Sequence, residues 1–240
     1  MILNILVLFI GTFLGGLLIY VVKTTATSLK LPLVFAGSFL FAVTVIHILP
    51  ELFSVSPNPM EMGMVVLLGF FFQQFLETFT SGVEHGHYHK GELSSNRRKA
   101  GLIGALVIHS VLEGSLLNHE SPFHHQHESH SLLLGILFHK IPAAFALMAV
   151  IKGQKGFRMG DLVILFIFSI SSPVGLLLSN AVIPISSPNM IFLFAFVSGS
   201  FLHISTTIFV ETSPNHHLGL KRTLVGIGGA LLAILAEYLS

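Results

Sequence analysis

The chain contains no cysteine, and charged residues make up only 10% of its 240 residues. Without cysteine it can form no disulfide and offer no thiolate to a metal ion, so a metal would have to bind histidine, glutamate, aspartate or neutral donors. Hydrophobic residues instead make up 52% of the chain, and the mean hydropathy is +0.84. A water-soluble domain of this length cannot accommodate that composition, which therefore indicates a polytopic membrane protein.

Two motifs typical of pumps and enzymes are also absent. No phosphate-binding loop of the GxxxxGKS/T type occurs, which argues against ATP-driven pumping. The apolar stretches contain no HExxH pair of the kind found in zinc proteases, and the only aspartate in the chain is Asp161. We therefore do not expect an enzyme, and we expect no catalytic cofactor.

Eight apolar stretches are long enough to cross a lipid bilayer, which takes about 20 residues of helix. We therefore predict an all-α fold, a polytopic bundle of eight transmembrane helices that forms a single domain over residues 1–240. The first stretch follows no basic region and no obvious cleavage site, so we expect a retained helix rather than a removed signal peptide. The predicted spans are 2–22, 31–53, 62–80, 100–117, 131–151, 161–182, 190–210 and 222–239.

Lysine and arginine are distributed asymmetrically along the chain. Of the 12 basic residues, all except Lys140 lie in or beside the loops after spans one, three, five and seven. Cytoplasmic loops collect basic residues, so we expect both termini on the opposite side, outside the cell or in an organelle lumen. The residues concerned are Lys23, Lys30, Lys90, Arg97, Arg98, Lys99, Lys152, Lys155, Arg158, Lys221 and Arg222.

Three ionisable residues lie near the middle of two neighbouring apolar stretches. His109 and Glu113 are four residues apart in span four, which places both side chains on one face of a helix, and His139 follows in span five. At a rise of about 1.5 Å per residue, all three fall within one layer of the membrane. Ionisable groups in such places mark functional sites, and these nitrogen and oxygen donors suit zinc. We therefore predict a divalent-metal site, the alternative being that each histidine is a hydrogen-bonded structural residue.

A short repeated sequence indicates internal symmetry. Gly37-Ser-Phe-Leu in span two recurs as Gly199-Ser-Phe-Leu in span seven, and the two spans run in opposite directions. Four matching residues could arise by chance in so apolar a chain, but inverted repeats are common in transporters. If the repeat is real, spans one to three and six to eight are related halves, and spans four and five lie between them.

Five short motifs occur in order along the chain. They are His47-x-x-Pro50-Glu51, His109-Ser-x-x-Glu113-Gly114, His139-Lys140-x-Pro142, Ser172-Pro173-x-Gly175 and Ser198-Gly-x-Phe-Leu202. In this order they resemble the motifs of the ZIP family of zinc and iron transporters, and the resemblance covers essentially all eight spans. It implies movement of a divalent metal toward the cytoplasm, a three-plus-two-plus-three (3+2+3) helix arrangement with inverted outer halves, and a transport site between spans four and five.

The chain departs from that family in span five. In the family's two-metal version this span supplies further ligands at positions that here are Lys140 and Ala143. A lysine ammonium is a cation on a flexible stem, so we predict that Lys140, with Ser110 near it, takes the place of a second metal. The chain would then resemble the single-metal-site branch of the family. The alternative is that Lys140 forms a plain structural pair with a carboxylate such as Glu113, or extends toward the membrane surface.

Further polar side chains inside the spans suggest a route for the metal. His47 and Glu51 lie toward the outer end of span two, whereas Glu77 in span three and His203 in span seven lie nearer the cytoplasmic side. We expect an ion to pass from the outer residues to the central trio and then past His203 or Glu77. The alternative is that the first two mark an ordinary helix end and that the others form hydrogen bonds between helices.

Two predicted loops are rich in histidine, a composition typical of metal binding. Residues 81–99 would face the cytoplasm, and residues 118–130 would face the outside or lumen. Neutral imidazole binds zinc near pH 7, so the outer loop could gather metal and the inner loop could receive or sense it. The alternative is a pair of polar linkers. The histidines are His85, His87 and His89 in the first loop and His119, His124, His125, His127 and His130 in the second.

Together these features predict a transporter that moves a divalent metal, with Zn²⁺ as the transported substrate, into the cytoplasm. Iron(II), manganese and cadmium could use the same donors, so selectivity stays open. Two alternatives are a membrane metal sensor or receptor without flux, and an intramembrane zinc hydrolase, since two histidines and a glutamate around an open zinc position can activate water. The expected partners are the metal ion and the lipid membrane, not nucleic acid. A homodimer, and the choice between plasma membrane and organelle membrane, are left open.

Overall fold

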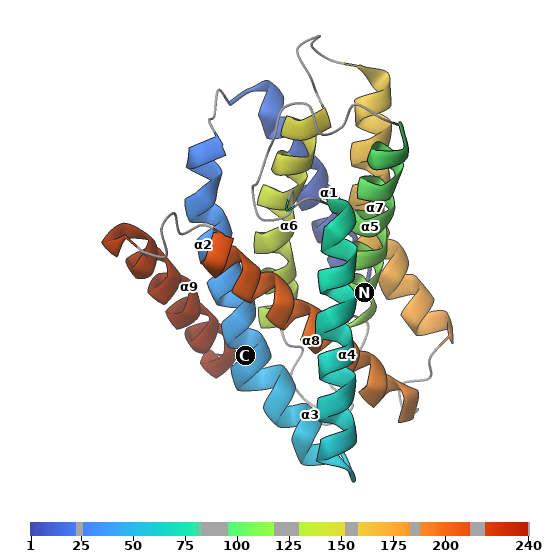
Figure 1. Cartoon of the computed structure of the whole chain (residues 1–240), viewed down its shortest axis with the longest axis vertical. Helices are drawn as coiled ribbons and strands as arrows, with labels where there is room; N and C mark the ends of the chain where they lie inside the picture. Colours follow the sequence, from blue (N-terminus) through green and yellow to red (C-terminus); the bar gives the residue numbers. More distant parts are fainter. Residues whose placement is uncertain are drawn as a thin grey trace.

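The computed structural model shows a bundle of α-helices (Figure 1), and the part of the chain that it describes contains no strand. It describes residues 1–22, 26–80, 82, 96–117, 130–151, 158–182, 188–211 and 219–239. The predicted all-α fold is confirmed for these residues. The elements are α1 (Ile2–Leu17), a 3-10 turn (Leu18–Tyr20), α2 (Ala26–Val43), a π-helical turn (Thr44–Ile48), α3 (Leu49–Val55), α4 (Pro59–Thr80), α5 (Asn96–Ser115), α6 (His130–Ile151), α7 (Met159–Val182), α8 (Pro188–Glu211) and α9 (Leu220–Leu239).

Within the described residues, seven helical segments are long and apolar enough to cross a membrane, and they coincide with seven of the predicted spans. The chain is therefore an integral membrane protein. The remaining predicted span, 100–117, lies in α5 except for its last two residues, and α5 differs from the other helices in its charge. Its first turn contains Arg97, Arg98 and Lys99, and Glu113 lies near its other end. The seven segments are Ile2–Tyr20, Lys30–Val55, Pro59–Thr80, Ser131–Ile151, Met159–Val182, Asn189–Phe209 and Leu220–Leu239.

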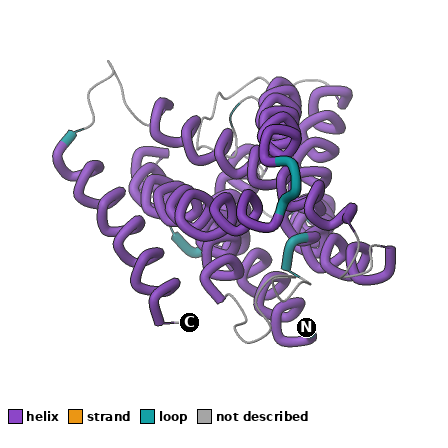
Figure 2. Tube along the Cα trace, turned by 90° about the horizontal axis from the view of Figure 1, so that it is seen from below, coloured by secondary structure: helices purple, strands orange, loops and turns teal. Residues whose placement is uncertain are grey.

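The helices pack in two groups, each around its own apolar core. Helices α1, α5, α6 and α7 share buried side chains that include Leu147 and Leu165. Helices α2, α4, α8 and α9 share a second core that includes Phe39 and Phe201, and it is extended by Leu8 of α1 and by side chains from the first half of α6. The most extensive packing joins α4 with α8, α2 with α9, α5 with α7, and α1 with α6. Helix α9, which carries the C-terminus, lies at one edge of the bundle (Figure 2).

Close crossings between these helix pairs depend on glycine. A Cβ atom at Gly69 of α4 would lie 1.8 Å from a backbone oxygen of α8, and one at Gly229 of α9 would lie 2.4 Å from a backbone oxygen of α2. A Cβ at Gly175 of α7 would lie 2.0 Å from a backbone oxygen of α5, and one at Gly15 of α1 would lie 3.0 Å from the backbone of α6. Gly15 and Gly175 are 160 residues apart in the sequence, and so are Gly69 and Gly229.

A π-helical turn interrupts the long segment formed by α2 and α3. The turn, Thr44–Ile48, contains His47 and directly precedes the first turn of α3, where Pro50 lies. Proline has no backbone N–H, so it cannot donate to the carbonyl of Ile46 four residues earlier, which loosens the helical pattern here. Such turns are frequent at functional sites. The π-helical turn therefore contains His47, for which the sequence predicts a role in transport.

Candidate metal site

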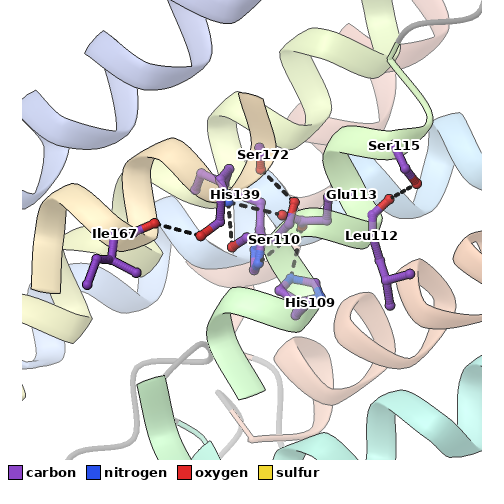
Figure 3. Close-up of polar contacts among 10 residues, drawn as sticks. His109, Ser110, Leu112, Glu113, Ser115, His139, Ile167 and Ser172 are labelled. Atoms are coloured by element: carbon purple, nitrogen blue, oxygen red, sulfur yellow. Dashed lines mark hydrogen bonds and ion pairs between the residues drawn. The ribbon is translucent and has the colours of Figure 1, made fainter. Parts of the chain in front are cut away.

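The three predicted ligand residues lie together between α5 and α6 (Figure 3). His109 and Glu113 are one helical turn apart on α5, and His139 of α6 lies beside them. One ligand atom from each residue lies within 4.8 Å of those of the other two. None of the three side chains is more than 3% exposed. The structure thus brings the residues together at a buried position, as the sequence spacing predicts for the two on α5.

The two carboxylate oxygens of Glu113 face different partners. Its Oε1 atom lies 3.0 Å from Nε2 of His109 and 4.0 Å from Nε2 of His139. Its Oε2 atom lies 3.4 Å from Nζ of Lys140. Zinc lies about 2.0–2.2 Å from nitrogen and oxygen ligands, so donors placed tetrahedrally around it are about 3.2–3.6 Å apart. With a small movement of His139, the two imidazoles and Oε1 can therefore hold one ion.

Lys140 is fully buried and its ammonium has three kinds of neighbour. Nζ donates a hydrogen bond of 2.7 Å to Oγ of Ser110, faces Glu113, and lies 4.5 Å from the ring centroid of Phe168 on α7. Removing an ammonium from water costs several kcal/mol unless other charges compensate it. Here a carboxylate oxygen and an aromatic face provide that compensation. A fixed positive charge therefore lies directly behind the candidate ligand Glu113.

Helix α7 holds α5 at the site. Oγ of Ser172 donates a hydrogen bond of 2.8 Å to the backbone carbonyl of Ser110 (Figure 3). A Cβ atom at Gly114 would lie 2.0 Å from the carbonyl oxygen of Ser172. The crossing therefore requires glycine next to Glu113, and it fixes the turn of α5 that carries this carboxylate.

Replacing Gly114 by alanine is expected to destabilise the protein by about 1–3 kcal/mol, because the added methyl group would push α5 away from α7. Gly104 on the same helix provides a matched control, since a Cβ atom there would meet nothing within 4 Å. Gly104→Ala should be neutral or slightly stabilising, because alanine favours helix more than glycine does. Thermal unfolding of both variants in detergent measures the difference. Equal melting temperatures for the two variants would contradict the role given to Gly114.

One protein similar to this chain is Protein zntD of Dictyostelium discoideum. The two sequences are 26% identical over 170 residues, which cover 65% of this chain and 24% of the relative. This chain thus spans about a quarter of that protein's length. No protein-family model matches the chain.

The four predicted pathway residues form two contacts away from the central trio. Nε2 of His203 on α8 lies 2.5 Å from Oε2 of Glu77 on α4. Nε2 of His47 lies 3.4 Å from Oε2 of Glu51, one turn further along the same segment. Among the described residues, neither pair joins the trio in a common group of metal donors. The structure therefore places these residues at separate positions, and their part in a pathway stays a prediction.

Sequence reasoning missed one carboxylate that belongs with His47 and Glu51. Oε1 of Glu237 on α9 lies 2.6 Å from Nδ1 of His47. Its Oε2 accepts a hydrogen bond of 2.5 Å from Oγ of Ser131, at the start of α6. Two signals point to Glu237 in the sequence: it is the only acidic residue of span eight, and it follows Glu77 by 160 residues, the spacing of the glycine pairs.

The metal sites predicted in the two histidine-rich loops lie outside the part of the chain that the structure describes. The side chains of all the loop histidines lie outside the described residues, so their metal binding stays a prediction. These are His85, His87, His89, His119, His124, His125, His127 and His130.

Proposed function

We propose that this chain is a transporter that moves a divalent metal, with zinc as the preferred substrate, across a membrane. The observation that carries the proposal is the buried trio of His109, Glu113 and His139 inside a bundle of membrane-spanning helices. Two imidazoles and a carboxylate are a donor set that zinc favours when no thiolate is present. Ionisable groups inside such bundles mark ion paths.

Transport through this site is an exchange of ligands in which no covalent bond is made or broken. His109, Glu113 and His139 replace water around the ion, and the ion leaves when the site opens to the other side by alternating access. One oxygen of Glu113 faces the two imidazoles, while the other faces Lys140. Three protein donors leave a fourth position to water, as in zinc sites that exchange their ligands. Such a site can bind the ion and still release it.

We further propose that α5 is the eighth membrane-spanning helix and that the chain has the 3+2+3 arrangement. One half would contain α1, α2 with α3, and α4; the other would contain α7, α8 and α9; α5 and α6 would lie between them. In this arrangement each helix has a counterpart in the other half, and α5 is the counterpart of α6. The packing of α4 on α8 then corresponds to that of α9 on α2, and the packing of α1 on α6 corresponds to that of α7 on α5. The glycine pairs 160 residues apart lie at corresponding crossings, which supports the inverted repeat.

The site is proposed to hold a single metal because Lys140 provides the second positive charge. Its ammonium lies 3.4 Å from Glu113, on the side away from the imidazoles. A second divalent ion at this position would meet a buried cation, and the repulsion would prevent it from binding. This distinguishes the chain from sites in which one carboxylate bridges two metals.

The orientation of the chain in the membrane is proposed from the basic residues. The described ones lie at or near the beginnings of α2, α5, α7 and α9, which are expected to start on the same side if successive spans alternate. We propose that this side is cytoplasmic. Movement of the metal toward it is proposed because the resemblance to the ZIP family implies that direction. In Figure 1, α2 runs downward from the upper left, α9 runs downward from the left edge, and α4 returns upward. Lys23, Lys90, Lys152 and Lys155 lie outside the described residues.

The two alternatives differ in what the trio would do. A zinc hydrolase needs a general base beside the metal-bound water. The carboxylate in the trio already faces both imidazoles and Lys140, so transport fits the described geometry better. A sensor would bind metal at the same residues without moving it. Flux therefore separates the sensor from the transporter.

Removing residues 121–130 is expected to raise the half-saturating zinc concentration for uptake while leaving the maximal rate nearly unchanged. This loop would gather zinc through its histidines and take no part in the central site. A variant in which the same histidines become serine keeps the loop length and serves as the control. A loss of maximal rate in both variants would show that the loop histidines take part in the movement itself.

The proposed function is tested by zinc uptake into liposomes that contain the purified protein. Radioactive zinc should accumulate faster than in liposomes without protein, and an excess of unlabelled zinc should suppress the accumulation. Competition by iron(II), manganese and cadmium would rank the metals. Zinc binding without accumulation, under several pH gradients, would favour the sensor.

A further inference from the structure

The two ends of the bundle carry the same arrangement of an imidazole and a carboxylate. At one end Glu77 of α4 contacts His203 of α8, and at the other Glu237 of α9 contacts His47 beside α2. In the proposed repeat, α4 corresponds to α9 and α2 corresponds to α8. Each contact therefore joins the third helix of one half to the second helix of the other half. The carboxylates are 160 residues apart, as are the glycines at the crossings of the same helices.

Accessibility separates these contacts from the central trio. The side chains of His47 and Glu237 are 23% and 20% exposed, whereas in the other contact Glu77 is 19% exposed and His203 is 6% exposed. In the trio no side chain exceeds 3%. An ion that moves between solvent and a fully buried site needs donors along the way, because it sheds water in steps. The His47–Glu237 contact offers one nitrogen and one oxygen donor at a partly exposed position.

The distance between the donors is close to what an ion requires. Nδ1 of His47 and Oε1 of Glu237 are 2.6 Å apart. Zinc between a nitrogen and an oxygen ligand holds them about 3.2–3.6 Å apart, so the contact has to open by about 0.6–1.0 Å. The π-helical turn that carries His47 interrupts the regular hydrogen-bond pattern of its helix, and such turns adapt locally. We expect the imidazole to separate from the carboxylate by a movement within this turn.

Glu237 is also connected to the helix that carries a central ligand. Its second oxygen accepts the hydrogen bond from Ser131 at the first turn of α6, and His139 lies further along α6. The other nitrogen of His47 faces Glu51 at 3.4 Å. Glu237 therefore directs one carboxylate oxygen to His47 and the other to Ser131 of α6. The outer contact and the central site thus share one helix.

We propose that Glu237 and His47 form the outer binding site for the transported divalent cation, and that this site is the counterpart of Glu77 and His203 at the cytoplasmic end. The inference rests on the proposed function and adds Glu237 to it as a ligand. The ion binds between the imidazole and the carboxylate before it reaches the central trio. The carboxylates at entrance and exit then occupy equivalent positions of the repeated unit, 160 residues apart, and each meets a histidine of the second helix of the other half.

Glu237→Gln tests the ligand role in transport. The amide keeps a side chain of the same size that can still bond to His47 and Ser131, but it lacks the negative charge that attracts the cation. The half-saturating zinc concentration should rise about tenfold or more, with the maximal rate changed little. Glu61→Gln makes the same charge change in the first turn of α4 and should leave uptake unchanged. If Glu237→Gln behaves like Glu61→Gln, Glu237 holds helices together and the proposal is wrong.

A second experiment measures binding directly and does not depend on flux. Because the chain has no cysteine, Glu237→Cys introduces a single thiol. Cadmium should slow the reaction of this thiol with a maleimide about tenfold or more when His47 is present, because thiolate and imidazole bind the ion together. The matched control combines Glu237→Cys with His47→Ala and should lose this protection. Equal protection in both proteins, or none in either, would overturn the outer site.

The two experiments distinguish the outer site from the proposed function. Cadmium protection that requires His47, in a protein whose wild type moves no zinc, would support the site and contradict transport. Zinc uptake by the wild type that is insensitive to Glu237→Gln, together with absent protection, would support transport and contradict the site.

Discussion

Replacing Glu113 by glutamine is expected to abolish zinc binding at the central site and to destabilise the protein by about 3–5 kcal/mol. The substitution has two separate effects. Glutamine removes the anionic oxygen that faces His109 and His139. It also leaves the ammonium of Lys140, which is completely buried, without the carboxylate that compensates its charge. Zinc titration and thermal unfolding in detergent measure the two effects separately.

A double variant separates loss of a ligand from loss of stability. Combining Glu113→Gln with Lys140→Met removes both charges and keeps similar side-chain volumes, which is often tolerated in a buried pair. Most of the stability should return, whereas zinc binding should not. Recovery of zinc binding in the double variant would show that Glu113 acts through Lys140 and is not a ligand.

Replacing Lys140 by aspartate is expected to create a second metal site. The ammonium now lies within 3.4 Å of Glu113 and 2.7 Å of Ser110. An aspartate at this position would place a second carboxylate beside Glu113, and two adjacent carboxylates in a buried site attract a cation. Elemental analysis of the purified variant should find one more zinc per protein than in the wild type. Its thermal stability should also depend on zinc more strongly.

Lys140→Met is the control for this change. It removes the positive charge without supplying a ligand, so it should not increase the zinc content. The histidine-rich loops are present in all three proteins and cancel in the comparison. Unchanged zinc content in Lys140→Asp would favour the plain structural pair between Lys140 and Glu113 over a substitute for a second metal.

The placement of His109 beside Glu113 was predictable because it depends on local geometry. His109 and Glu113 share a helix face at a spacing of four residues, and the depth of His139 follows from the rise per residue. What the sequence does not contain is the orientation of each side chain. The division of Glu113 between imidazoles and Lys140, and the position of Phe168 over the ammonium, depend on how α5, α6 and α7 pack.

The contact between His47 and Glu237 could not be predicted from the sequence of either helix alone. His47 and Glu51 stand out because they share a segment, but Glu237 lies 190 residues away from His47 in sequence and meets it only when α9 packs on α2. The repeated Gly37-Ser-Phe-Leu word was visible in the sequence. The spacing of 160 residues becomes informative when the structure shows that Gly69 and Gly229 lie at corresponding crossings.

The extent of α5 could be predicted less well than its site residues. The apolar stretch 100–117 has the length of a span, but the helix begins with three basic residues and contains Glu113. Composition alone therefore sets it apart from the seven apolar segments. Packing explains how the charge is accommodated, because the face that carries His109, Ser110 and Glu113 is buried in the bundle.

The central claim is that metal passes through the site between α5 and α6. Zinc uptake by liposomes containing wild type, His109→Ala or His139→Ala, after each protein has been shown to be folded and inserted, tests it most directly. The account predicts that both variants lose uptake, because each removes one of three donors around the ion. Uptake at the wild-type rate in both variants would place the path elsewhere in the protein.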